Sequence, residues 1–199
     1  DLPGEKRGMI PNDQYYDKAY NRSWNGLTII SISIGQGEVT ATPLQIANLG
    51  ATIANRGYFI TPHVVKEVEG DSLDSLYTQK RYTKVRREHY ETVVQGMRQA
   101  VLGGTCRGAD LPGIEVCGKT GTAQNRGKDH SAFMGFAPMK EPKIAVAVYV
   151  ENGGWGATYG VPIGALIMEK YLNGSLSAES ELKAQDIQKR RIDYGIHER

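Results

Sequence analysis

The chain has 199 residues, of which 40% are hydrophobic and 23% charged, and its net charge is +2. This length suffices for one domain with a buried core, and the composition is that of an ordinary globular protein. The small net charge, without a dense run of Lys and Arg, argues against nucleic-acid binding, and apolar stretches such as residues 144–150 are too short to span a membrane. No signal peptide is recognisable at residues 1–5 (DLPGE), which read like the interior of a longer chain, so we expect a fragment.

The first third of the chain predicts one clear helix. Residues 1–26 are rich in Pro, Gly, Asn and Tyr and are expected to form a long surface loop with short turns. Residues 27–34 (LTIISISI) fit either a short strand or a turn of helix, because periodicity does not decide between them. Residues 42–55 begin with Thr-Pro-Leu-Gln, a capping box with proline at the first helical position, and predict a helix that Gly57 ends. Its narrow polar stripe indicates burial on nearly all sides, as in a domain larger than this chain.

The middle of the chain predicts a helix followed by a sheet. Residues 58–68 read as extended segments, and residues 70–81 as a polar surface excursion. Residues 87–102 carry apolar side chains at helical spacing on one face. Strands are expected over residues 114–122, 131–137 and 144–150. Their short connections imply an antiparallel meander.

The end of the chain predicts a last helix and a charged segment. Pro162 begins the helix and Gly174 ends it. Residues 175–199 are highly charged and are expected to form a surface helix or a frayed tail. The sequence therefore predicts an α+β fold in which helices flank an antiparallel β-sheet, with one domain over residues 1–174 and a charged C-terminal tail over residues 175–199.

The two cysteines, Cys106 and Cys117, lack the paired spacing of a zinc site. Because a free cysteine packs like a small hydrophobic residue, two buried thiols are favoured over a disulfide.

Residues 116–125 (VCGKTGTAQN) place one lysine between two glycines and a run of hydroxyl groups. Residues 113–120 (GIEVCGKT) even satisfy the P-loop pattern. The residues between the two glycines favour a strand, however, and Gly121 with the polar residues 124–127 argues against the helix that a P-loop requires. We therefore reject a phosphate-binding loop.

An acyl-transfer site fits the same segment better. Lys119 and Thr120 would point to opposite faces of a flat strand, so both can serve one cleft only at the edge of a sheet. A peptide substrate could pair with the backbone there, and Gly121 would let it approach closely. The amide of Thr122 would be free to donate to a developing oxyanion, a contact worth about 3–4 kcal/mol in comparable hydrolases.

These residues carry a family resemblance. Lys119-Thr120-Gly121 resembles the Lys-Thr-Gly motif of penicillin-binding proteins and serine β-lactamases. Residues 35–45 (GQGEVTATPLQ) are similar to a segment of the class B penicillin-binding proteins, and residues 1–5, 129–138 and 144–154 match that family too. The resemblance covers about residues 1–172 and is closest to the elongation-specific penicillin-binding protein 2 group.

The resemblance implies a serine-type peptidoglycan D,D-transpeptidase without a metal or organic cofactor. It implies that Lys119 supplies positive charge and assists the proton relay, and that Thr120 and Thr122 bind the substrate's terminal carboxylate. The Thr122 amide would form part of the oxyanion hole, and Gly121 would permit close approach. The implied partners are peptidoglycan stem peptides, β-lactam antibiotics and a membrane glycan polymerase of the elongation machinery. The implied location is the periplasmic face of the bacterial inner membrane, with an N-terminal anchoring helix outside this chain.

The family's nucleophilic serine, in Ser-x-x-Lys, and its Ser-x-Asn motif are expected upstream of residue 1, so this chain alone should be inactive. Two internal matches are rejected on context: residues 180–183 (SELK) follow Lys-Thr-Gly, and residues 23–25 (SWN) lie in the block just before GQG. Two other functions stay open. One is a serine β-lactamase or β-lactam sensor, and the other is a non-catalytic peptidoglycan-binding module.

Four further polar or aromatic side chains follow the motif in the sequence. His130 is favoured as a structural or substrate-lining residue, because the family uses lysine as its base. Asp129 and Glu151 adjoin turns and are not expected to form a carboxylate pair. Trp155 lies in a Gly-rich loop, where it could contact a partner or the substrate, or cap the core.

Overall fold

The computed structural model describes residues 2–192 and 194. In chain order, the elements are α1 (Asp13–Ala19), α2 (Gly26–Ser33), α3 (Pro43–Ala54), β1 (Tyr58–Phe59), α4 (Ser75–Thr78), β2 (Arg81–Tyr82), α5 (Arg87–Leu102), the 3-10 helix η1 (Arg107–Ala109), β3 (Cys117–Ala123), β4 (His130–Ala137), β5 (Ile144–Val150), α6 (Gly160–Asn173) and α7 (Ala178–Lys189).

The main sheet is the predicted antiparallel meander. Its strand order is β3-β4-β5, so β3 lies at an edge of this sheet in the part of the chain that the structure describes. Gly121 pairs with Ala132 on β4, and Phe133 pairs with Val148 on β5. The Lys-Thr-Gly segment is therefore on an edge strand.

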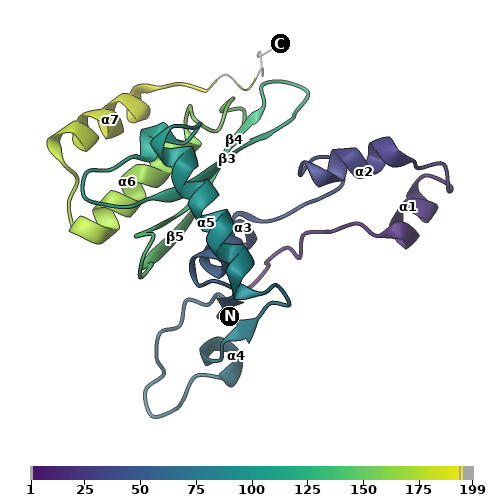
Figure 1. Ribbon diagram of the computed structural model, residues 1–199, viewed down its shortest axis with the longest axis horizontal. Helices are drawn as coiled ribbons and strands as arrows, with labels where there is room; N and C mark the ends of the chain where they lie inside the picture. The colour runs from purple at the N-terminus through teal and green to yellow at the C-terminus, as the bar shows by residue number, and fades with distance from the viewer. Residues whose placement is uncertain (1, 193, 195–199) are drawn as a thin grey trace.

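Helices cover both faces of this sheet (Figure 1). On one face, Phe133 packs with Val161 and Met168 of α6. On the other face, Cys117 and Phe136 pack with side chains of α3 and α5. This arrangement confirms the α+β fold with an antiparallel sheet between helices, and burial of these side chains removes apolar area from water, which stabilises the three layers.

The capping box at the start of α3 is confirmed. The Thr42 side chain accepts a hydrogen bond from the Gln45 amide, and the Gln45 side chain accepts one from the Thr42 amide. The expected burial on nearly all sides is not found in this chain, because Leu49 is 54% exposed. The C-terminal half of α3 packs on the sheet, whereas none of the buried residues of α3 lies in its N-terminal half.

Residues before α3 form an arm that projects from the sheet (Figure 1). The expectation of loop over residues 1–26 missed α1, which begins because the Asn12 side chain accepts a hydrogen bond from the Tyr15 amide. Residues 27–34 resolve as the helix α2, for which the Asn25 side chain is the N-cap. A carboxylate links α1 to the loop after α2: Glu38 accepts hydrogen bonds from the hydroxyls of Tyr20 and Tyr16, and these bonds lower its pKa.

Several boundaries differ from the sequence expectation. β3 begins at Cys117 rather than at Ile114, because Gly113 turns at a φ of +75° and Leu111 bridges Ile114. Within residues 58–68, only β1 is a strand, and β2 pairs with it. The polar segment that follows contains the short helix α4.

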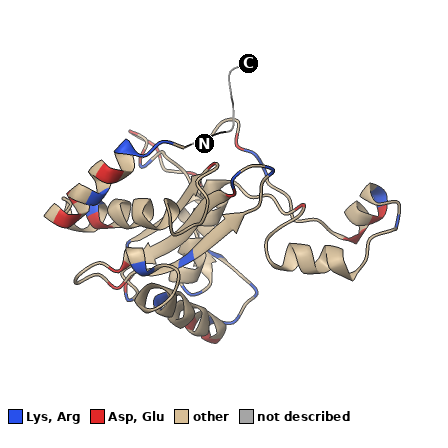
Figure 2. Cartoon of the chain, turned by 90° about the horizontal axis from the view of Figure 1, so that it is seen from above, with Lys and Arg blue, Asp and Glu red and all other residues tan. Residues whose placement is uncertain are grey.

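At the C-terminal end, α6 begins two residues before Pro162 and ends at Gly174, whose φ of 75° is left-handed. The charged segment forms the helix α7, while residues 193 and 195–199 lie outside the described residues. Figure 2 shows charges of both signs along α7 and none on α2. Among the described residues, no helix has the length and apolar character needed to cross a membrane.

Candidate active site

The backbone of β3 presents polar groups along its open edge. The Thr122 carbonyl accepts a hydrogen bond from Gln36 Nε2 at 3.0 Å. The Thr120 carbonyl accepts one from Lys119 Nζ at 2.8 Å. Neither donor belongs to β4, so the carbonyls of Thr120 and Thr122 point away from β4, toward the open edge of β3. Because the N–H and C=O of one strand residue point to the same side, the Thr122 amide faces the open edge as well.

A hollow of about 320 Å³ lies beside the hydroxyls of this edge strand. It is lined by Thr105, Thr120, Thr122, Trp155, Gly156 and Ala157. The hydroxyls of Thr105 and Thr120 are hydrogen-bonded to each other at 2.8 Å. Trp155 is 75% exposed, so it lines this hollow and does not cap the core.

The loop that carries Trp155 is fixed to the sheet. The buried Ser131 hydroxyl donates to the Trp155 carbonyl at 2.8 Å and accepts from the Gly160 amide at 3.0 Å. A Cβ at Gly156 would lie 2.5 Å from the Ala132 carbonyl oxygen and 2.7 Å from that of Gly121. The loop therefore lies directly on β3 and β4, and this close approach forms one wall of the hollow.

Side-chain donors mark the two ends of the open edge. Before the strand, Arg98 Nη1 donates to the Val116 carbonyl at 3.0 Å. At the other end, Gln36 Nε2 donates to the Thr122 carbonyl. Between these two ends, the backbone N–H groups that face the open edge include those of Thr120 and Thr122.

The two cysteines are free and buried, as predicted. Burial raises the pKa of the Cys106 thiol, which lies next to Thr105 and the Thr120 backbone. Burial also raises the pKa of Cys117 to about 11. Since the thiolate is the reactive form, neither cysteine is set up as a nucleophile.

The remaining polar candidates are His130, Asp129 and Glu151, and the first two make contacts that support turns. His130 Nδ1 accepts from the Asn152 amide at 3.0 Å, and its ring lies 5.3 Å from that of Tyr149. The Asp129 carbonyl accepts from the Gly154 amide, which fixes the base of the Trp155 loop. Glu151 is exposed at the end of β5. His130 and Asp129 thus support the turns beside the hollow.

The two rejected serine motifs also have local explanations. In residues 23–25, the Asn25 side chain is the N-cap of α2, and Trp24 Nε1 donates to Asp17 Oδ1 at 2.8 Å. In residues 180–183, Ser180 is buried on α7, and its amide donates to the Ser177 hydroxyl at the start of that helix.

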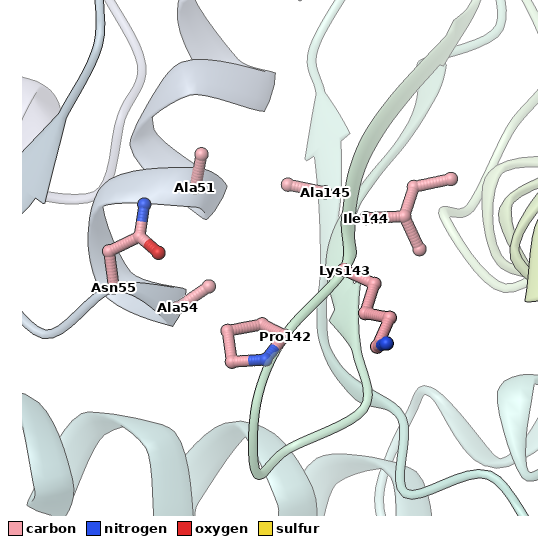
Figure 3. A pocket seen from close by; sticks show the side chains of 7 residues that line it. All are labelled: Ala51, Ala54, Asn55, Pro142, Lys143, Ile144 and Ala145. Atoms are coloured by element: carbon pink, nitrogen blue, oxygen red, sulfur yellow. The ribbon is translucent and has the colours of Figure 1, made fainter.

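A smaller hollow of about 130 Å³ lies between α3 and the start of β5 (Figure 3). Alanine side chains face one another across it, and Lys143, the one charged side chain drawn, extends away from α3. Most of the side chains that line this hollow are apolar, so we do not consider it a catalytic site. No group of three metal-binding side chains occurs among residues 2–192 and 194.

Comparison with known proteins identifies relatives of most of the chain. Residues 1–171 match the family model of the penicillin binding protein transpeptidase domain. The peptidoglycan D,D-transpeptidase MrdA of Acinetobacter baumannii is 35% identical over 177 residues, which cover 79% of this chain and 26% of that protein. The crystal structure of Pseudomonas aeruginosa PBP2 in complex with WCK 5153 matches with a TM-score of 0.73 at 36% identity, over 90% of this chain and 40% of that one.

A second solved structure comes from a peptidoglycan synthase complex described as coordinating polymerization and crosslinking. It matches with a TM-score of 0.73 at 34% identity, over 88% of this chain and 30% of that one. This chain is thus much shorter than each of these relatives.

Sequence reasoning found the motif but missed part of its surroundings. Thr105 and Gln36 were not singled out, although each touches the edge strand. The signal for Gln36 was its place between two glycines in GQG. Thr105 had no signal, because a threonine after a helix is common.

Proposed function

Because the chain belongs to the penicillin-binding protein transpeptidase domain family, we propose that it forms one wall of the active site of a serine-type peptidoglycan D,D-transpeptidase. The observation that carries this proposal is the open edge of β3, where the Lys119 ammonium donates to the Thr120 carbonyl and where Thr120 and Thr122 line a hollow. We assign residues 1–174 to the transpeptidase domain and residues 175–199 to a tail.

The chemistry divides between this chain and the rest of the protein. A serine supplied N-terminal to residue 1 attacks the carbonyl between the two terminal D-alanines of a stem peptide. The C–N bond breaks, the terminal D-alanine leaves with the serine's proton, and a serine ester forms. An amine of a neighbouring stem peptide then attacks this ester, which forms the cross-link and restores the serine hydroxyl.

The edge strand provides charge and hydrogen bonds for this reaction. The Lys119 ammonium already lies at the edge, 2.8 Å from the Thr120 carbonyl, where it can support the proton relay and attract a carboxylate. The hydroxyls of Thr120 and Thr122 line the hollow and would bind that carboxylate. The Thr122 amide would donate to the oxyanion of the tetrahedral intermediate. Gly121 keeps the strand open to a close-lying ligand.

The partners and location follow from the same proposal. The substrates are peptidoglycan stem peptides, and β-lactam antibiotics would acylate the same serine. The similarity to a chain of a peptidoglycan synthase complex supports a membrane glycan polymerase as partner. Because its proposed substrate is peptidoglycan, we assign the enzyme to the periplasmic face of the inner membrane, with the anchor supplied by another part of the protein.

Labelled penicillin tests the proposal. The full-length protein should form a covalent adduct, while the 199-residue chain alone should form none. Lys119→Ala in the full-length protein should slow acylation on the order of 100-fold, the loss seen when one transition-state contact is removed. Lys140→Ala, at an exposed lysine in the turn between β4 and β5, is the matched control and should acylate at the wild-type rate.

Other results would redirect the assignment. A stable adduct on a serine of the isolated chain would contradict the division of the active site. Unchanged acylation by Lys119→Ala would remove its assigned role. Rapid turnover of a chromogenic cephalosporin by the full-length protein would favour a β-lactamase, and a full-length protein without any adduct would favour a non-catalytic peptidoglycan-binding module.

A further inference from the structure

The side chain of Gln36 takes the place of a missing neighbour strand at the end of β3. Its Nε2 donates to the Thr122 carbonyl at 3.0 Å. Its Oε1 accepts from the Gln124 amide at 3.4 Å. Thr122 and Gln124 are two residues apart and therefore face the same edge. One carboxamide thus makes the pair of bonds that a neighbouring strand would make.

The loop around Gln36 is built to hold this side chain in place. Gly35 and Gly37 have φ values of +78° and +68°, a conformation that favours glycine. A Cβ at Gly37 would lie 3.2 Å from the Ser31 hydroxyl, so the loop is also packed closely against α2. One residue further on, Glu38 is held by its hydrogen bonds from Tyr16 and Tyr20. The backbone on each side of Gln36 is therefore restrained.

These bonds lie next to the proposed oxyanion donor, the Thr122 amide. β3 ends at Ala123. A strand that is paired on one side only frays most easily at its end. Thr122 is the last residue of the motif, and the proposed oxyanion donor is its amide. An error of about 1 Å in such a group can cost about 100-fold in rate.

We propose that Gln36 is a positioning residue for the transpeptidase reaction: its carboxamide fixes the end of β3 so that the Thr122 amide stays aimed at the open edge. This inference rests on the proposed function. Gln36 does not touch the reacting atoms, and it acts through the backbone of Thr122.

Acylation kinetics of the full-length protein test this role. Gln36→Ala removes both bonds, and Gln36→Glu keeps the acceptor for Gln124 but loses the donor to Thr122. Both variants should lower the first-order acylation rate constant with labelled penicillin about tenfold or more, with little change in penicillin affinity or Tm. Gln99→Ala, at an exposed glutamine on α5, is the matched control and should behave as wild type.

Amide hydrogen exchange on the 199-residue chain tests the contact separately. Gln36→Ala should speed exchange at Gln124, whose amide loses its acceptor, while β5 keeps its wild-type rates. Unchanged exchange there overturns the contact. Faster exchange with unchanged acylation overturns the positioning role, as does faster acylation, which would mean that Gln36 competes with the substrate. A full-length wild type that is not acylated overturns the proposed function and the positioning role together, while the exchange data still decide the contact.

Discussion

At the scale of single residues, the hollow beside the motif depends on a glycine outside the motif. Gly156 lies so close to β3 and β4 that a Cβ would come within 2.5 Å of the Ala132 carbonyl oxygen. Gly156→Ala should therefore lift the Trp155 loop from the sheet and lower the free energy of unfolding by about 1–3 kcal/mol. Denaturant unfolding of the 199-residue chain measures the loss.

The control for this substitution is Gly127→Ala, because a Cβ there meets nothing within 4 Å and the φ of Gly127 is not positive. This variant should unfold at the wild-type denaturant concentration. Equal stability of the Gly156 and Gly127 variants would show that the loop is not seated on the strands.

The placement of the motif on an edge strand could be predicted because one short segment carried the signal. Lys119, Thr120, Gly121 and Thr122 are consecutive, so their spacing on a strand could be deduced directly. The contact between Gln36 and Thr122 joins residues 86 positions apart, and it depends on how the arm is placed against the sheet. Local spacing contains no information on such a contact.

At the scale of elements, the attachment of α7 depends on a buried carboxylate of α6. Glu169 is 4% exposed, and its Oε1 accepts from the amide of Ser177, the N-cap of α7, at 2.9 Å. Burial alone would raise its pKa, but the polar groups of Ser180 and Ser177 and the charge of Lys183 outweigh burial and lower it. A carboxylate with a lowered pKa stabilises the folded state above its ordinary pKa, and this stabilisation is lost as the pH falls through the lowered value.

Glu169→Gln should therefore loosen α7 at neutral pH, because a neutral amide interacts less strongly with the N-terminus of a helix. Amide hydrogen exchange in α7, corrected for the intrinsic pH dependence, should be faster than in wild type at pH 7. The difference should shrink as wild-type Glu169 becomes protonated in acid. Glu151→Gln, at an exposed residue just after β5, removes a carboxylate away from α7 and is the control. If the difference between Glu169→Gln and wild type does not change with pH, the carboxylate's charge does not hold the helix.

Elements with strong end signals were predictable, and elements without them were not. The helix that begins at Pro43 has a capping box, and α6 ends at a left-handed glycine, so both were found. The short helix α1 was missed, because its Asn12 cap and close-set tyrosines resemble a loop composition. α2 stayed undecided, since a helix with hydrophobic residues on all sides has no period to read.

At the scale of the whole molecule, the arm before α3 leaves apolar surface without a partner. α2 has no buried residue, and Leu27, Ile30 and Ile34 are 74%, 61% and 71% exposed. Exposed apolar patches on a soluble domain mark surfaces that bind another body. The proposed function requires a further part of the protein that carries the serine, and we expect that part to cover α2. The same part of the protein would bury the exposed side of α3, as the sequence of α3 predicts. The residues of α3 themselves do not tell which segment covers them.

Aspartates on α2 should therefore have opposite effects in the short and the long protein. In the 199-residue chain, Leu27→Asp with Ile30→Asp should reduce binding of a hydrophobic dye and improve solubility, because these side chains face water there. In the full-length protein the same pair should lower the free energy of unfolding by about 3 kcal/mol or more, since each buried Leu or Ile contributes about 1.5–3 kcal/mol. Leu182→Asp on α7, where Leu182 is 67% exposed, should leave the full-length protein's stability unchanged. Equal stability of the full-length α2 variant and wild type would mean that α2 faces water in the complete protein, and another surface would then have to join this wall of the active site to the serine.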